Sequence, residues 1–165
     1  MAAMWEKLVI LLNHTLQIYQ ALLQLSRKKR EILVEAKPQE LELLTKQEER
    51  FIIEAGKLEK LRLSTIQELA AALGIAPERA VLSELVEHAD SDTAAELKKI
   101  GQQFSGLAGE LTQLNELNEK LIQQSLEFVN YNINVLSQAT AESTYAPKGQ
   151  PETTRPGRSL LDTKV

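Results

Sequence analysis

The longest apolar pattern in the chain runs from Leu97 to Leu136. Its members recur at steps of three and four, which keep side chains on one face of an α-helix, so the stretch predicts one long amphipathic helix. From Leu114 through Asn118 the steps become fours, a stutter that rotates an apolar stripe around its helix. We therefore expect the two halves of this helix to face different neighbours. The apolar members are Leu97, Ile100, Phe104, Leu107, Leu111, Leu114, Ile122, Leu126, Val129, Ile133 and Leu136.

Two further long helices are predicted upstream. The first spans about Ala3 to Glu35 and has an apolar face broad enough to touch more than one partner helix. Pro38 marks the start of the second, because proline fits the first helical turn and disfavours helical angles at Lys37. Gly74 is a typical helix stop.

The segment between Gly74 and Asp90 is short and mixed. Pro77 predicts a helix of a few turns there. Thr93 with Glu96 three residues later has the form of a capping box, which predicts the start of the third long helix. Three glycines inside that helix lower its intrinsic stability, or else they allow a neighbouring helix to approach closely. They are Gly101, Gly106 and Gly109.

Three long helices and a short one, with short connections, predict an all-α fold: an elongated antiparallel helical bundle with a disordered C-terminal tail. We expect a bundle domain over residues 1–140 and a flexible tail over 141–165. The tail contains three prolines and no apolar period, which is typical of a segment that cannot form a packed core. Its apolar tip, which includes Leu160 and Leu161, is either a docking peptide or an incidental chain end.

Composition excludes several classes of function. The net charge of −4 offers no basic field for nucleic acid, and aromatic residues form only 4% of the chain, too few for a base-stacking platform. The absence of cysteine removes disulfides, thiolate nucleophiles and most zinc sites. No signal peptide and no unbroken apolar run of membrane-spanning length are evident, so we expect a cytoplasmic protein without membrane insertion.

Candidate catalytic chemistry is sparse. Glu84 and His88 are spaced i,i+4, which we interpret as a surface ion pair rather than a metal site because no further ligands accompany them. His14 has no nucleophile motif beside it. Four consecutive cations, residues 27–30, point all round a helix and read as a solvated patch. We therefore expect no enzyme activity, no metal and no cofactor.

What remains is association with other proteins. Asn115 and Asn118 interrupt the long stripe, and they either fix helix register or hydrogen-bond an incoming backbone. Beyond Glu127 the third helix is almost without charge until Glu142 and keeps an apolar face, which suits a helix-on-helix partner. The predicted partner-binding residues are Asn115, Asn118, Ile122, Leu126, Val129, Ile133 and Leu136.

These features resemble the FlgN family of flagellar export chaperones. The resemblance is carried by Leu114-Asn115-x-x-Asn118-x-x-Leu121-Ile122 in a long last helix, followed by Val135-Leu136. A tail element at residues 145–150, Tyr-Ala-Pro-Lys-Gly-Gln, is similar to a Tyr-Gly-x-x-Gly element of the family, with Ala146 where glycine is usual. The layout of helices and tail matches over the whole length.

The resemblance implies a cytoplasmic chaperone that holds the C-terminal helical segments of hook-associated proteins of the FlgK and FlgL type. It also implies delivery of these clients to components of the flagellar export gate, with Tyr145 and Gly149 in the docking tail. The competing interpretation is a structural coiled-coil or adaptor protein that uses the long third helix for self-association. Weak homo-oligomer formation is compatible with either.

Overall fold

The computed structural model describes residues 1–144, and their side chains as far as residue 139. Its elements are α1 (Ala2–Val34), α2 (Pro38–Leu73), the 3₁₀ turn η1 (Pro77–Arg79), α3 (Leu82–Val86) and α4 (Ser91–Thr144). The chain divides into a first unit, Met1–Ser125, and a second unit, Leu126–Val165. All regular elements in the described part are helical, which confirms the all-α prediction.

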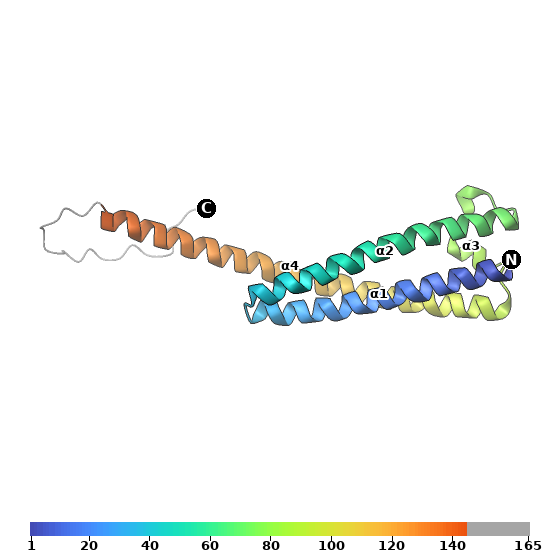
Figure 1. Cartoon of the computed structure of the whole chain (residues 1–165), viewed down its shortest axis with the longest axis horizontal. Helices are drawn as coiled ribbons and strands as arrows, with labels where there is room; N and C mark the ends of the chain where they lie inside the picture. Colours follow the sequence, from blue (N-terminus) through green and yellow to red (C-terminus); the bar gives the residue numbers. More distant parts are fainter. Residues whose placement is uncertain (145–165) are drawn as a thin grey trace, which may run out of the picture. The chain divides into compact units, whose positions relative to one another are not determined.

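Helices α1 and α2 form an antiparallel hairpin, seen as the blue and teal helices of Figure 1. The connection is tight because Glu35 caps α1 and Ala36 takes a left-handed φ of 54°. Pro38 occupies the first turn of α2, as predicted, and Gly74 ends that helix with φ of 69°. Both boundaries therefore follow from local backbone chemistry, since proline suits a first turn and glycine suits positive φ.

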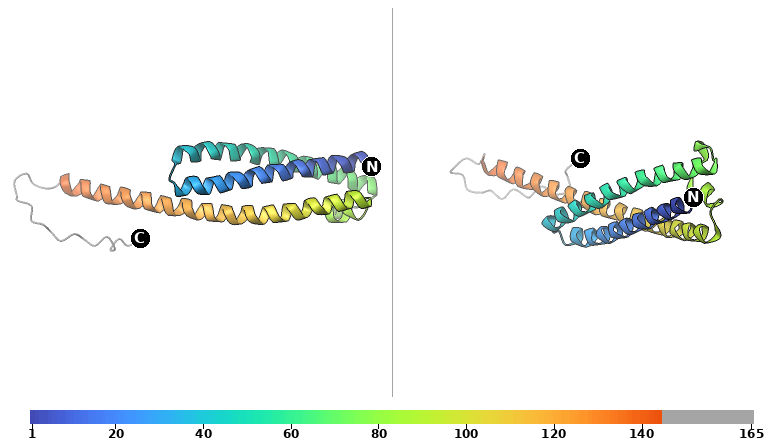
Figure 2. Two further views of the ribbon diagram at one scale, coloured as in Figure 1. Left: turned by 90° about the horizontal axis from the view of Figure 1, so that it is seen from below. Right: turned by 45° about the vertical axis from the view of Figure 1, so that its right-hand side comes forward.

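The part of α4 within the first unit runs parallel to α1. Tyr19 stacks edge-on against Phe104 with ring centroids 5.5 Å apart, and further along both helices Ser26 bonds to Asn115. Residue numbers increase in the same direction along both helices, so α1, α2 and α4 have an up-down-up arrangement. Figure 2 shows the three helices side by side within this unit.

The densest core lies at the end of the first unit where α3 is located. Side chains of all four α-helices meet there, and Leu8, Leu69 and Leu85 are completely buried. The single helix predicted from Pro77 is wrong: η1 and α3 are separate, with Val81 extended between them. Leu85 of α3 is fully buried and belongs to this core. The core residues are Trp5, Leu8, Leu12, Ile66, Leu69, Ala70, Leu85, Leu97 and Ile100.

The start of α4 differs from the predicted capping box. Asp90, not Thr93, caps the helix: its carboxylate accepts hydrogen bonds from the Thr93 backbone N–H at 2.9 Å and from the Thr93 hydroxyl at 2.8 Å. These bonds, above all the one from the backbone N–H, lower the pKa of the Asp90 carboxyl. An aspartate one position before Ser91 thus satisfies an orphan donor of the first turn.

The three glycines inside α4 are not sites of close helix approach within this chain. A Cβ atom added at Gly101, Gly106 or Gly109 would meet nothing within 4 Å. Of the two interpretations left open by the sequence, close approach of a neighbouring helix therefore finds no support among the described residues. The glycines instead lower the intrinsic helix propensity of this part of α4.

Helix α1 is, by length and hydropathy, the one described helix apolar enough to cross a membrane. The sequence of this helix has no unbroken apolar run of membrane-spanning length. Burial in the core of the first unit accounts for part of its high mean hydropathy. Trp5, Leu8 and Leu12 of α1 are part of the buried core of the first unit. The composition of α1 is thus that of a helix with a broad core-facing stripe.

Candidate partner-binding sites

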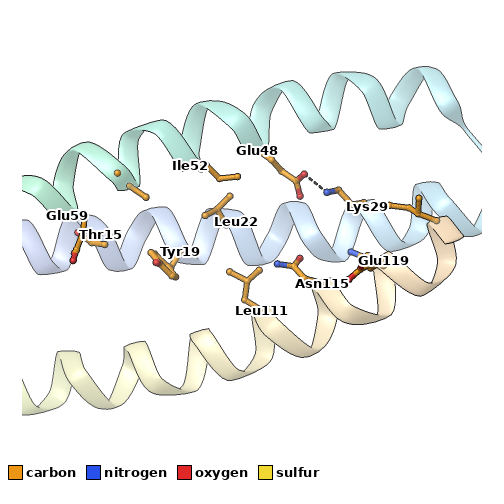
Figure 3. A pocket seen from close by; sticks show the side chains of 14 residues that line it. Thr15, Tyr19, Leu22, Lys29, Glu48, Ile52, Glu59, Leu111, Asn115 and Glu119 are labelled. Atoms are coloured by element: carbon orange, nitrogen blue, oxygen red, sulfur yellow. Dashed lines mark ion pairs between the residues drawn. The ribbon is translucent and has the colours of Figure 1, made fainter.

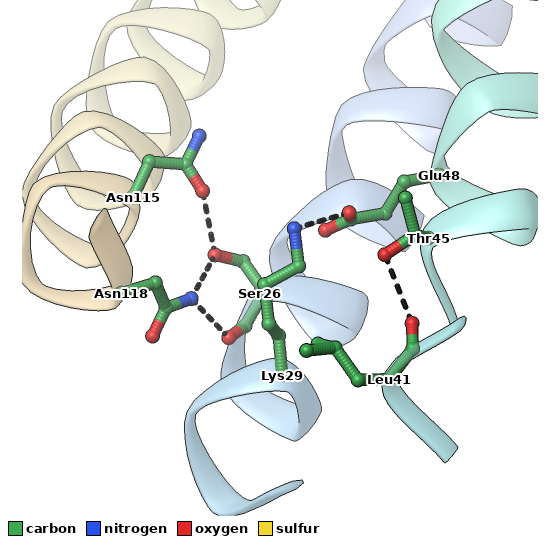
Figure 4. Close-up of polar contacts among 7 residues, drawn as sticks. All are labelled: Ser26, Lys29, Leu41, Thr45, Glu48, Asn115 and Asn118. Carbon is green, nitrogen blue, oxygen red and sulfur yellow. Dashed lines mark hydrogen bonds and ion pairs between the residues drawn. The ribbon is translucent and has the colours of Figure 1, made fainter. Parts of the chain in front are cut away.

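A polar layer joins α1 to α4 in the first unit (Figure 4). Asn118 donates from Nδ2 to the Ser26 carbonyl oxygen at 2.9 Å and lies 3.2 Å from the Ser26 hydroxyl oxygen. That hydroxyl donates to Asn115 Oδ1 at 2.7 Å. Asn118 is only 2% exposed and Ser26 only 1% exposed. Asn118 is therefore engaged inside the bundle, whereas Asn115 accepts its bond from Ser26 at an exposed position of α4. Contacts of this kind between helices are expected of residues that fix helix register.

The asparagines occupy the same face of α4 as its core residues. At about 100° per residue, Leu97, Ile100, Asn115 and Asn118 fall within one arc about 60° wide. The bonds to Ser26 show that this arc still faces α1 at Asn118. The stripe therefore still faces α1 at Asn118, and its rotation beyond that residue stays a prediction.

A groove of about 650 Å³ lies beside this polar layer (Figure 3). All three long helices of the first unit line it, and Leu22, Ile52 and Leu111 point into the space between the helices. On the α2 side the lining includes Ala55 and Gly56, whose small side chains leave the volume unfilled. Ile52 is 59% exposed and Ile122 is 36% exposed, so the groove is open to solvent.

Three of the seven predicted partner-binding residues line this groove: Asn115, Asn118 and Ile122. The remaining four lie in the second unit. Sequence periodicity placed all seven on one helix, but it gave no sign of a groove, because the other walls come from α1 and α2.

The polar groups of the groove differ in whether they are engaged. Lys29 forms an ion pair with Glu48, and both side chains are largely buried. Glu59 accepts two hydrogen bonds from the Arg62 guanidinium, which lower the pKa of the Glu59 carboxyl. Among the described residues, Glu119 forms no ion pair, and Asn118 Oδ1 is a buried acceptor without a hydrogen-bond partner.

The second unit presents an apolar helical stripe of its own. Leu126 is 57% exposed, Val129 50%, Ile133 54% and Leu136 66%. At about 100° per residue these four side chains share an arc about 80° wide. Large apolar side chains concentrated on one face at such exposure are typical of a protein-binding surface.

A second exposed apolar face of the same segment was missed by the sequence analysis as a binding feature. It consists of Phe128, which is 68% exposed, with Tyr131 and Val135. Their spacing of three and four residues was the available signal, but it was masked by the stronger stripe through Leu126 and Ile133. The segment therefore has apolar groups on two opposite sides, which allows contact with more than one partner segment.

The basic run at residues 27–30 is not simply a solvated patch. Lys29 pairs with Glu48 of α2, and Arg27 pairs with Glu110 of α4, so two of the four cations link α1 to its neighbours.

The pair predicted between Glu84 and His88 is also wrong, because Glu84 pairs with Arg79. Within the described residues, no group of three or more His, Asp and Glu side chains is placed so that it could bind a metal ion. Tyr145 and Gly149, predicted for gate docking, lie outside the described residues.

Comparison with known proteins identifies the family. The sequence profile of the family described as FlgN protein matches residues 1–153, so the chain belongs to the FlgN family and is a flagellar export chaperone. It is similar to the Bacillus subtilis (strain 168) protein described as "Uncharacterized protein YvyG", with 25% identity over 149 residues that cover 90% of this chain and 91% of that protein. No solved structure matches the chain.

Proposed function

We propose that this chaperone holds the C-terminal helical segments of hook-associated proteins of the FlgK and FlgL type in the cytoplasm and delivers them to the export gate. The observation that carries the proposal is the exposed stripe of Leu126, Val129, Ile133 and Leu136 in the second unit. Membership of the FlgN family supports hook-associated proteins as the clients.

The chemistry of the stripe suits a reversible holdase. Between Glu127 and Glu142 the chain has no charged residue, so an apolar helix of a client meets no buried charge that must be desolvated. Client segments that fold only on assembly expose apolar faces, and covering such a face requires no nucleotide. Release then requires only competition from another surface.

Delivery to the gate is assigned in this proposal to the tail from Tyr145, through Tyr145 and Gly149. The support is the resemblance of residues 145–150 to the tail element of the family. Removal of residues 145–165 should leave client affinity unchanged and abolish binding to purified gate components. Loss of client affinity in the truncated protein would contradict this division of labour.

The client-binding stripe is tested by a double substitution, Val129→Asp with Ile133→Asp. Both side chains are at least half exposed, so the first unit should remain folded while affinity for a purified hook-associated protein falls by a factor of 100 or more, as expected for about 3 kcal/mol from two central apolar contacts. Isothermal titration calorimetry measures the affinity, and circular dichroism monitors the fold.

The matched control is Asn130→Asp with Asn134→Asp, which adds the same charge to the same helical segment away from the stripe. Its affinity should stay within about threefold of the unmodified protein, since rim charges contribute little. Equal loss of affinity in both double variants would show a general charge effect and overturn the assignment. A stable dimer that dissociates only in Val129→Asp with Ile133→Asp would favour self-association instead.

A further inference from the structure

We infer that the groove in the first unit is a second docking site, which takes a short amphipathic helix from the client with a lysine or arginine beside its apolar face. The inference rests on the proposed function in taking the client as the source of that helix. All residues that line the groove belong to the first unit, whereas the stripe belongs to the second unit.

The dimensions of the groove suit a helix of about three turns. Its lining extends from Thr15 to Lys29 on α1 and from Leu111 to Ile122 on α4, which corresponds to about 17–21 Å at 1.5 Å per residue. A volume of about 650 Å³ accommodates several apolar side chains that project from such a helix. A helix packed there would complete a four-helix arrangement with α1, α2 and α4.

Gly56 gives the α2 wall of the groove an unusual composition. It lies inside a long helix, where glycine is the least favourable residue after proline, yet a Cβ atom there would meet nothing within 4 Å. No contact within the described chain therefore requires a glycine at this position. A partner helix that packs closely against the α2 backbone does benefit from the absence of a side chain.

The polar groups specify the charge of the partner. The one cation in the lining, Lys29, is already paired with Glu48, whereas Glu119 on the α4 wall has no ion-pair partner among the described residues. The buried atom left without a partner, Asn118 Oδ1, is an acceptor, and Asn118 lines the groove while only 2% exposed. The groove thus offers acceptors and negative charge, which a lysine or arginine complements by donating hydrogen bonds.

The absence of cysteine from the chain allows occupancy to be measured directly. Gly56→Cys introduces a single thiol on the groove wall, and Gly106→Cys introduces one at another helical glycine with open surroundings outside the groove lining. A saturating amount of purified hook-associated protein should slow alkylation of Cys at position 56 by iodoacetamide about tenfold or more, and leave position 106 unchanged. An unchanged rate at position 56 in the complex would overturn the inference.

Affinity measurements supply a second readout. Gly56→Leu fills the groove while raising helix propensity, so client affinity should fall about tenfold without loss of thermal stability, whereas Gly106→Leu should have little effect. Glu119→Lys should weaken client binding, and the loss of affinity should become smaller as salt is added. Glu116→Lys, on the same helix and outside the lining, should leave client affinity unchanged. Equal affinities for both members of each pair would overturn the inference.

The outcomes separate this inference from the proposed function. Suppose that the double variant Val129→Asp with Ile133→Asp no longer binds the client, and that Gly56→Cys with an unmodified stripe binds the client but keeps a reactive thiol. The groove inference then fails, and the stripe assignment stands. Absence of any complex with hook-associated proteins overturns both. Protection of position 56 in the free protein that is lost on dilution, or on removal of residues 145–165, would assign the groove to a second copy or to the chain's own end, and either result overturns the inference.

Discussion

Asn118 of α4 donates a hydrogen bond from its side-chain Nδ2 to the backbone carbonyl oxygen of Ser26 in α1, at 2.9 Å. The two residues are 92 positions apart in the sequence, and both are nearly completely buried. This bond fixes the axial register of α4 relative to α1, because a shift of either helix by one turn would leave the amide without its partner. A buried polar layer of this kind specifies register between helices.

Replacement of Asn118 by alanine should destabilise the first unit by about 1–3 kcal/mol, since it removes the amide that meets Ser26 and leaves unfilled volume. In a double-mutant cycle, Asn118→Ala and Ser26→Ala should show a coupling energy of about 1 kcal/mol, which reports the contact of Asn118 with the Ser26 hydroxyl because Ser26→Ala retains the backbone carbonyl. Urea denaturation followed by circular dichroism gives the free energies of unfolding. Gln113→Ala, at an exposed position of α4, is the control and should be nearly neutral. Additive losses would contradict a stabilising contact between Asn118 and the Ser26 hydroxyl, and a nearly neutral Asn118→Ala would contradict the role of the bond to the Ser26 carbonyl oxygen.

The ion pair between Lys29 of α1 and Glu48 of α2 should contribute more to stability than the exposed pair of Lys46 with Glu42 within α2. Lys29 and Glu48 are 18% and 12% exposed, whereas Lys46 and Glu42 are 61% and 69% exposed. Glu48→Ala leaves a mostly buried ammonium without its partner and should cost about 2 kcal/mol. Glu42→Ala should cost at most about 0.5 kcal/mol. Chemical denaturation of the two variants measures both values, and equal losses would contradict the prediction.

The cap of α4 should make stability depend on pH in acid. The Thr93 backbone N–H lowers the pKa of the Asp90 carboxyl in the folded protein, so the ionised cap stabilises the fold at pH values above the unfolded pKa of about 3.9. That contribution is lost as the pH falls through the lowered folded pKa. Asp90→Asn retains a capping side chain without a titrating group.

The measurement for this prediction is the difference in free energy of unfolding between the unmodified protein and Asp90→Asn, from urea titrations at several pH values from neutral to strongly acidic. The difference should favour aspartate near neutral pH and should diminish in acid. A difference that is constant with pH would show that the Asp90 carboxylate makes no favourable contact in the folded state.

Amides of the second unit should exchange with solvent faster than those of the core in the free protein. Residues 126–139 carry highly exposed apolar side chains, and helices without tertiary packing are marginal in water. Hydrogen–deuterium exchange with mass spectrometry should show little protection there and strong protection near Leu8 and Leu12. Addition of a hook-associated protein should slow exchange in 126–139 without altering the core. Strong protection of this segment in the free protein would contradict the prediction.

The positions of the long helices follow from sequence alone because their determinants are local. Pro38 begins α2, Gly74 ends it, and apolar residues at steps of three and four extend along α4. The chaperone family was also recognisable, since the order of the Leu-Asn-x-x-Asn element, the long last helix and the tail is a property of the sequence. The exposed stripe through Leu126 and Ile133 was located in the same way.

The predictions that were wrong concern short-range choices that several residues can satisfy. Asp90 and Thr93 are both suitable caps, and the position at which the chain turns into α4 selects Asp90. Glu84 has a possible partner on either side in the sequence, Arg79 and His88, and the fold of η1 brings it to Arg79. Such local alternatives differ by about 1 kcal/mol, which tertiary packing readily overrides.

The sequence by itself determined the helices and their apolar faces, because periodicity and helix-ending residues act over a few positions. Only the tertiary structure decided what the asparagines do, since the partner of Asn118 is Ser26, far away in the chain. Only it revealed the groove, whose walls come from three helices. Side chains on one helix define a face, but the space between helices depends on how their faces meet.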